Sequence, residues 1–212
     1  MRYRHILSLW ALLLVWGCNQ GTKPSESDQK DSVDTVVPTT AEEVQSISEV
    51  ITRFARAYAS KDNAKANQLI HPDLGIYIIY SPGVADNFVK MDSLDFQSPF
   101  PSFYAYTDLE HDFALTFDEL PEISCDDFTW DKQGFICDTT ARPQQLLRIA
   151  EFANEFNEGE YTPADLKNLE AIGNQSFRVI ITAEEALIFH VQHYQSKWYV
   201  TLLDRAYTNC DA

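Results

Sequence analysis

Two histidines near the C-terminus are the first side chains whose spacing suggests chemistry. His190 and His193 lie three residues apart in an apolar segment. Two imidazoles can share a Zn²⁺ ion when both face it, but residues three apart on a strand point to opposite faces of a sheet. We therefore predict no metal site here. His193 is expected on the apolar face beside Trp198, and His190 on the other face opposite Thr201.

Acidic side chains gather between residues 118 and 127. These residues are Asp118-Glu119, Glu122 and Asp126-Asp127. Their spacing is not the Asp-x-Asp-x-Asp-Gly spacing of a calcium loop. We expect them to be solvent-exposed. The chain also has no Gly-rich phosphate loop, no Gly-x-Ser-x-Gly elbow and no His-Glu-x-x-His run. The sequence predicts no cofactor or metal, although this does not exclude an enzyme.

Cys18 has the most informative context of the cysteines. It follows a basic start, an apolar run from Ile6 to Val15, and then Trp16-Gly17. This order is typical of a signal peptide, and the run is too short to span a bilayer. Because Gly17 directly precedes a cysteine, residues 1–18 resemble a bacterial lipoprotein signal peptide. The resemblance implies removal of residues 1–17 and lipid on Cys18, which makes the membrane a partner through that lipid. Plain secretion is the alternative.

A polar stretch follows the lipidation site. Residues 19–39 contain only three large apolar residues, Val33, Val36 and Val37, so they cannot bury enough surface to become ordered. We predict that residues 18–39 form the lipidated cysteine and a flexible tether. Asn19 stands where some bacteria use Asp to retain lipoproteins at the inner membrane. The resemblance therefore favours the outer membrane, with the folded part in the periplasm or at the cell surface.

Three further cysteines, Cys125, Cys137 and Cys210, belong to a compartment in which disulfides persist. Three thiols allow one bridge and one orphan. We predict that Cys210 fastens the C-terminal tail to Cys125 or to Cys137, because closing the longer loop stabilises more. A bridge between Cys125 and Cys137 is the alternative. A catalytic thiol is a further hypothesis, although no Cys-Gly or Cys-x-x-Cys context supports it.

The charge balance bears on the kind of partner. The chain has 32 acidic and 16 basic residues, a net charge of -16, and no basic block beyond its first residues. Binding to a phosphate backbone would have to overcome this repulsion. We therefore expect no nucleic-acid partner.

The elements that must position these groups begin at Thr40, and we predict one α+β domain over residues 40–212. A helix is expected first, since apolar residues recur at steps of three and four, with Thr40 as N-cap and Glu43 at N3. A short helical piece, 63–70, and a strand, 74–80, follow. The apolar positions of the first helix are Val44, Ile47, Ile51, Phe54 and Tyr58.

Two helices and a meander are expected towards the C-terminus. The first helix covers about 143–156. The second covers 162–174, where Thr162 is the N-cap and Pro163 the first helical residue. The apolar face of the first helix consists of Leu146, Ile149, Ala150, Ala153 and Phe156. The strands cover 177–182, 186–194 and 197–205. If Gln195-Ser196 is a two-residue turn, Val191 faces Val200 and Phe189 faces Leu202. Leu187 and Trp198 then join the same buried face.

The order of these elements resembles the NTF2-like (SnoaL-like) superfamily. The resemblance rests on Phe54-Ala-x-Ala-Tyr58-x-x-Lys61-Asp62, on His71-Pro72-Asp73 and on Trp198-Tyr199-Val200 in the last hairpin. It implies an α+β cone, in which N-terminal helices pack on a curved antiparallel sheet that ends in a three-strand meander. Another α+β sandwich is the alternative.

Two classes of function remain open at this point. In the first, a non-catalytic ligand-binding or assembly domain contacts an envelope protein, a carbohydrate or a cationic group through the aromatic and acidic stretch 88–135. The alternative for this stretch is that its aromatic side chains fill the core under long loops. In the second, the resemblance implies a pocket enzyme of the hydrolase or isomerase kind, with His193 and Asp204 on one sheet face as acid and base. We favour binding, because only fold analogy supports catalysis.

Overall fold

The computed structural model describes residues 41–157, 159–183 and 185–206. Cys18, the tether, Thr40 and Cys210 lie outside this range, so the expectations about them stay predictions. The side chains of residues 41–45, which include Val44 and Glu43, are also outside the description. Among the described residues, no helix has both the length and the hydropathy needed to cross a membrane.

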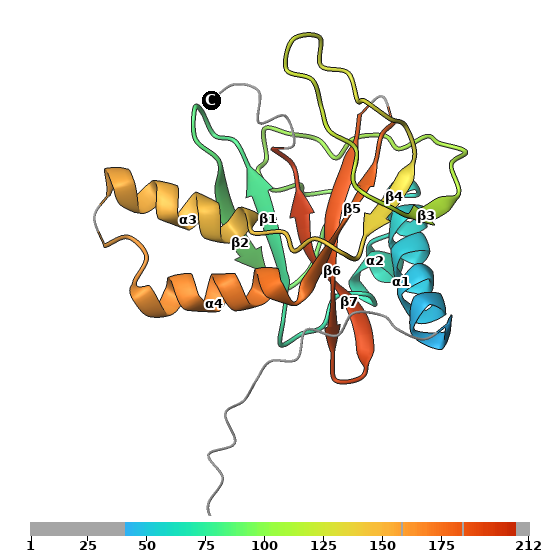
Figure 1. Ribbon diagram of the computed structural model, residues 1–212, viewed down its shortest axis with the longest axis horizontal. Coiled ribbons are helices and arrows are strands. Elements are labelled where there is room, and N and C mark those ends of the chain that lie inside the picture. Colours follow the sequence, from blue (N-terminus) through green and yellow to red (C-terminus); the bar gives the residue numbers. More distant parts are fainter. Residues whose placement is uncertain (1–40, 158, 184, 207–212) are drawn as a thin grey trace, which may run out of the picture. The chain divides into compact units, whose positions relative to one another are not determined.

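The described chain is an α+β fold built on a seven-stranded open mixed sheet (Figure 1). Across the sheet the order is β2-β1-β7-β6-β5-β4-β3. The strands are β1 (Ile76–Tyr80), β2 (Asn87–Met91), β3 (Leu115–Phe117), β4 (Phe135–Asp138), β5 (Ser176–Ile181), β6 (Leu187–Tyr194) and β7 (Lys197–Asp204). The three expected meander strands are present in the middle of this sheet.

The resemblance implied an antiparallel sheet, but two of its strand pairs are parallel. β1 runs parallel to β7, and β3 runs parallel to β4. A short turn forces antiparallel pairing, whereas strands joined through a long connection are free to run parallel. β1 and β7 are separated by most of the domain, so no turn sets their relative direction.

One face of the sheet is covered by α1 (Ala41–Ala59), with the short α2 (Asn63–Asn67) beside it. The predicted apolar stripe is confirmed for Ile47, Ile51, Phe54 and Tyr58, which are all buried. Phe54 packs on Phe189 of β6, with ring centroids 4.8 Å apart. These contacts fill the space between α1 and the sheet with apolar side chains.

The opposite face carries α3 (Gln145–Phe156) and α4 (Pro163–Asn174) (Figure 1). The expected start of α4 is confirmed, since the Thr162 hydroxyl accepts from the backbone N–H of Asp165 and the Asp165 carboxylate accepts from that of Thr162. The expected apolar face of α3 is only partly confirmed. Leu146 and Ala150 are buried, but Phe156 is 72% exposed. Helices therefore cover both faces of the sheet, not one.

The last hairpin shows where the predicted register fails. Gln195 and Ser196 both have positive φ, which fits a two-residue turn, and Val191 pairs with Val200 as expected. A bulge then places an extra residue, Thr201, in β7. Phe189 consequently pairs with Leu203, not Leu202, and His190 pairs with Leu202, not Thr201.

The bulge exchanges the faces of every later side chain in β7. Leu203 joins Trp198 and Val200 in the α1-side core, while Leu202 packs on the side of α3 and α4. Asp204 therefore lies on the α3 side of the sheet. This single inserted residue has a direct consequence for the candidate site.

Candidate binding pocket

The two candidate catalytic residues are not brought together. His193 pairs with Trp198 beside the last turn, and their ring centroids lie 5.1 Å apart. Asp204 is at the other end of β7, paired with Ile188. Because of the bulge, the two side chains also lie on opposite faces of the sheet. The predicted acid and base pair is therefore not assembled.

A large pocket lies instead at the end of the sheet where β1 and β7 finish and β6 begins. We call it the sheet-end pocket. Its volume is about 1120 Å³, slightly above the range of roughly 300–1,000 Å³ that is usual for small-molecule sites. Its walls come from segments far apart in the chain: 79–86, 103–108, 145–152, 185–187 and 203–206, together with Tyr58 of α1.

The floor of the sheet-end pocket is mainly apolar. Ile79, Leu187 and Leu203 are almost completely buried, and the ring of Tyr106 is 7% exposed. Asp204 and Gln145 are the buried polar side chains beside them. An apolar floor with a few placed polar groups is typical of a ligand site.

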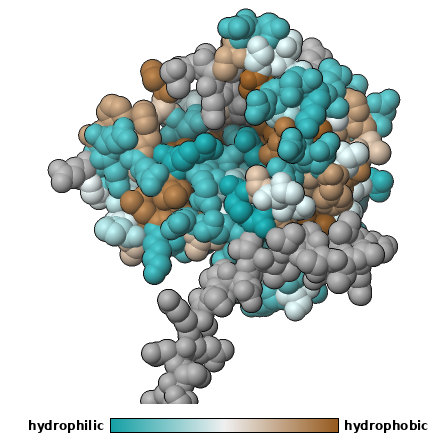
Figure 2. All heavy atoms as spheres, viewed as in Figure 1, coloured by the Kyte–Doolittle hydropathy of each residue, from teal (hydrophilic) through white to brown (hydrophobic). Residues whose placement is uncertain are grey.

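The rim of the pocket concentrates exposed apolar side chains. Of the seven large hydrophobic residues that are exposed in the described chain, four line this pocket. They are Val84 (85% exposed), Phe103 (62%), Tyr104 (38%) and Phe152 (43%). The face of the molecule viewed in Figure 2 is mostly hydrophilic, with separate apolar patches. Exposed apolar groups gathered around a hollow indicate a place where another molecule is bound.

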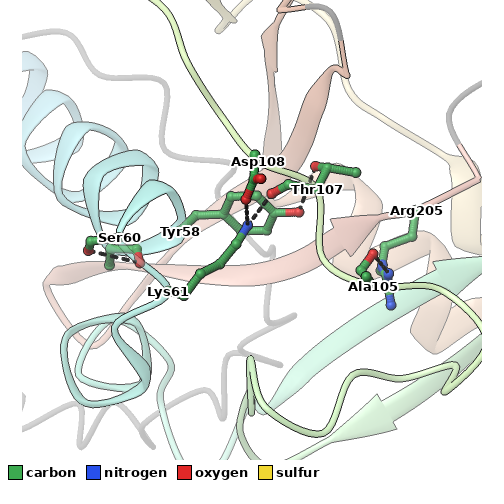
Figure 3. Close-up of polar contacts among 8 residues, drawn as sticks. Tyr58, Ser60, Lys61, Ala105, Thr107, Asp108 and Arg205 are labelled. Atoms are coloured by element: carbon green, nitrogen blue, oxygen red, sulfur yellow. Dashed lines mark hydrogen bonds and ion pairs between the residues drawn. The ribbon is translucent and has the colours of Figure 1, made fainter.

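The wall formed by residues 103–108 is fastened by two cations (Figure 3). Arg205, which directly follows β7, donates to the carbonyls of Tyr104 and Ala105 over 2.9 and 2.6 Å, and also to the carbonyl of Phe100. Lys61 donates to the carbonyl of Thr107 and lies 4.4 Å from the centre of the Tyr58 ring. This segment has no regular secondary structure, so these side chains hold it in place.

The Tyr58 hydroxyl completes this fastening. It lies 3.1 Å from Thr107 Oγ1, so the two hydroxyls share a hydrogen bond (Figure 3). Burial raises the pKa of Tyr58 above its usual value. A neutral phenol that is already bonded serves as part of the wall and not as a base.

A buried ion pair supports the α3 side of the pocket. Arg178 Nη2 donates to Asp204 Oδ2 over 3.2 Å. With the Gln145 amide oriented so that its oxygen faces Arg178, that oxygen accepts from Nη1 at 2.7 Å and from Nε at 3.1 Å. Burial raises the pKa of Asp204, while the charge of Arg178 opposes this shift. The pair therefore places polar groups on the floor at a considerable desolvation cost.

The chemistry available in the pocket favours binding. None of the four described histidines, His71, His111, His190 and His193, lines it. The Ser81 hydroxyl donates to the Asp86 carboxylate, and the Tyr58 hydroxyl is bonded as described. Within the described ranges, no group of three His, Cys, Asp or Glu side chains could hold a metal ion. The pocket offers apolar surface and hydrogen bonds, with no imidazole to move a proton.

The aromatic stretch 88–135 contributes to the pocket only in part. Phe103 and Tyr104 are on its rim, but Phe96 is buried under α1, and Phe117 and Phe128 are exposed away from it. The wall from α3 was not anticipated, although Gln145, Arg148 and Phe152 recur at helical spacing on one side. That spacing mixes polar and apolar residues, so it gives no amphipathic signal.

His190 is buried beneath α3 and α4 on the far side from α1. It is 3% exposed, and its Nε2 has no hydrogen-bond partner within the described residues. Burial, and then the charge of Arg178 on the neighbouring strand, lowers the pKa of His190 well below its usual value. The folded protein therefore keeps this imidazole neutral.

This burial predicts an acid sensitivity of folding. Below about pH 6.5 the unfolded chain binds a proton at residue 190 that the folded chain does not bind, so the free energy of unfolding falls by up to about 1.4 kcal/mol per pH unit. Urea denaturation between about pH 5 and pH 7 measures this slope. His190→Gln should reduce it and His193→Gln should not. An unchanged slope in His190→Gln would contradict the assignment.

The structure decides the redox state of one of the three cysteines. Cys137 of β4 is a free thiol and is buried, so the alternative bridge between Cys125 and Cys137 is wrong. Cys210 lies outside the described residues, and its pairing stays a prediction. If the tail bridge forms, its partner is Cys125.

A thiol titration tests this arrangement. Burial raises the pKa of Cys137 to about 12, so it should not react with Ellman's reagent in the folded protein at about pH 8. In denaturant without reductant we expect one reactive thiol per lipidated chain. Three thiols would show that Cys125 and Cys210 are not paired. A non-reducing peptide map identifies the pair directly.

In comparisons with protein-family models, with curated proteins and with solved structures, nothing matches this chain.

Proposed function

We propose that this chain is a lipid-anchored protein of the bacterial envelope, and that its folded domain binds a small organic ligand in the sheet-end pocket. The single observation that carries the binding role is the gathering of exposed apolar side chains around a pocket of about 1120 Å³. The location rests on the sequence before residue 18. The membrane is then a partner through lipid on Cys18 and not through the polypeptide's own charge, which is strongly negative.

The proposal also includes an NTF2-like fold. It is supported by the order of α1, α2 and β1 and by the closing meander of β5, β6 and β7. The insertion of α3 and α4 between β4 and β5, and the two parallel strand pairs, are departures from the simple cone. A pocket enclosed by the sheet and its helices suits such a fold, whichever ligand it holds.

A neutral apolar dye tests the pocket itself. We would titrate Nile red into residues 18–212 carrying Cys18→Ala, which have neither acyl chains nor the apolar run Ile6–Val15 to bind the dye. Phe152→Ser removes an apolar group from the rim and should weaken binding about tenfold, since burying a phenyl ring contributes at least roughly 1.5 kcal/mol.

Phe117→Ser is the control for this experiment. Phe117 is on β3, is 38% exposed and does not line the pocket, whereas Phe156 packs on Phe152 and is not independent of it. Phe117→Ser should leave the affinity for Nile red unchanged. Equal weakening by both variants, or no binding by either, would contradict a binding role for the sheet-end pocket.

A further inference from the structure

Two bases and four acids line the sheet-end pocket. The bases are Arg148 and Arg205, and the acids are Asp86, Asp108, Glu185 and Asp204. Lys61 and Arg178 are outside the lining but contact residues of its wall. The net charge of the lining does not show which base is free to meet a ligand, so each base is considered by its partners.

Most of these charges are already engaged. Arg205 donates to three carbonyls, and Arg178 is bonded to Asp204 and Gln145. Lys61 lies 3.9 Å from Asp108, and both Asp108 and Glu185 act on its charge. These groups stabilise the walls and have little capacity left for a ligand.

Arg148 is the cation that remains available. It is exposed on α3 and lines the pocket, and its side chain makes no hydrogen bond or ion pair within the described residues. Its charge acts unfavourably on Arg178, whose single acidic partner is Asp204. A guanidinium that has no partner among the described residues is available to a ligand, and a carboxylate matches its two parallel N–H groups.

Apolar surface lies on the same helix beside this charge. Ile149 and Phe152 follow Arg148 on α3 and line the pocket, and Phe103 and Tyr104 stand on the loop that forms another wall. A ligand that satisfies both features has an apolar body and an anionic end. A plain sugar would leave the exposed phenyl groups and Arg148 without matching partners.

We propose that the ligand of the sheet-end pocket is an amphipathic carboxylate, with its apolar part among Phe103, Tyr104 and Phe152 and its acid group paired with Arg148. This inference rests on the proposed binding function and specifies the ligand's chemistry. The pairing is partly exposed to solvent, so its strength decreases as salt is added.

Three probes with alkyl tails of similar length and different heads test this inference. Octanoate, octyltrimethylammonium and octyl glucoside, each below its micelle concentration, are titrated by calorimetry into residues 18–212 carrying Cys18→Ala. We expect octanoate to bind most tightly. Arg148→Gln should weaken octanoate binding about fivefold and leave octyl glucoside binding unchanged.

Arg53→Gln is the control for the loss of a positive charge. Arg53 is exposed on α1, where it pairs with Glu49, and it does not line the pocket. Its substitution should leave octanoate binding unchanged. The inference is overturned if the ammonium or the glucoside binds as tightly as octanoate, or if Arg148→Gln has no effect. Nile red binding that responds to Phe152→Ser would still support the proposed function in that case, whereas failure of every probe removes both.

Discussion

Replacing Arg178 by methionine is expected to lower the free energy of unfolding by about 3–5 kcal/mol at neutral pH. The substitution leaves Asp204, whose side chain is 7% exposed, without its cationic partner. Gln145 also loses the donors that its side-chain oxygen accepts from. An unpaired buried carboxylate costs far more than the pair contributes, because both charges were removed from water on folding. Urea denaturation measures the change.

The pH dependence identifies the cause of this loss. Burial already raises the pKa of Asp204, and removing Arg178 raises it further. A raised pKa in the folded state means that stability is present at low pH and is lost as pH rises. The deficit of Arg178→Met should therefore shrink as the pH falls towards about 4, because Asp204 in the folded variant takes up a proton at a higher pH than it does in the unfolded chain.

Two further variants separate the effect of the unpaired Asp204 charge from the effect of losing any arginine that forms an ion pair. Adding Asp204→Asn to Arg178→Met should recover part of the lost stability at neutral pH, because no buried charge remains. Arg53→Met removes one partner of an exposed pair on α1 and should change stability by only about 0–1 kcal/mol. A deficit in Arg178→Met that does not vary with pH would show that packing, not the charge of Asp204, is responsible.

The parts of the fold that follow from local sequence were predictable. The spacing of Ile47, Ile51 and Phe54 gives the buried side of α1, because helical periodicity alone decides which side chains share a face. Thr162 and Asp165 mark the start of α4 through hydrogen bonds between near neighbours. The turn at Gln195 and Ser196 sets the first pairs of the last hairpin in the same way.

The bulge at Thr201 could not be read from the sequence. Strict alternation from Trp198 places Asp204 on the same face as His193, and the sequence contains no glycine or proline nearby that would signal an interruption. The bulge instead lets Leu203 join the α1-side core and Leu202 the α3-side core. Tertiary packing therefore decides the faces, and it separates the two residues that would have formed an acid and base pair.

The pocket escaped prediction for a related reason. Its walls combine residues from 58 to 206, and no sequence pattern joins Val84, Phe103 and Phe152. The parallel pairing of β1 with β7 brings the ends of these two strands together, and α3 then closes one side. Composition indicated aromatic residues available for binding, but only the topology determines which of them share one pocket.

Replacing Cys18 by alanine is expected to abolish acylation completely, and the chain without residues 1–17 is then expected to leave the membrane. Removal of residues 1–17 takes away Arg2 and Arg4 and no acid, which leaves 14 basic and 32 acidic residues and a net charge of -18. Such a chain is repelled by anionic lipid headgroups. Acyl chains must then provide the attachment, and each buried methylene contributes about 0.8 kcal/mol.

Mass spectrometry of the purified chain and fractionation of the expressing cells measure these two effects. The parent chain should carry acyl mass on Cys18 and remain with the membranes after a high-salt wash, since salt weakens only electrostatic attachment. Cys137→Ala, which removes a buried thiol, is the control and should keep both properties. Acyl chains on the Cys18→Ala protein, or an unprocessed parent chain dissolved in the cytoplasm, would contradict the lipid anchor. The second result would also remove the oxidising compartment on which the tail disulfide depends, because thiols stay reduced in the cytoplasm.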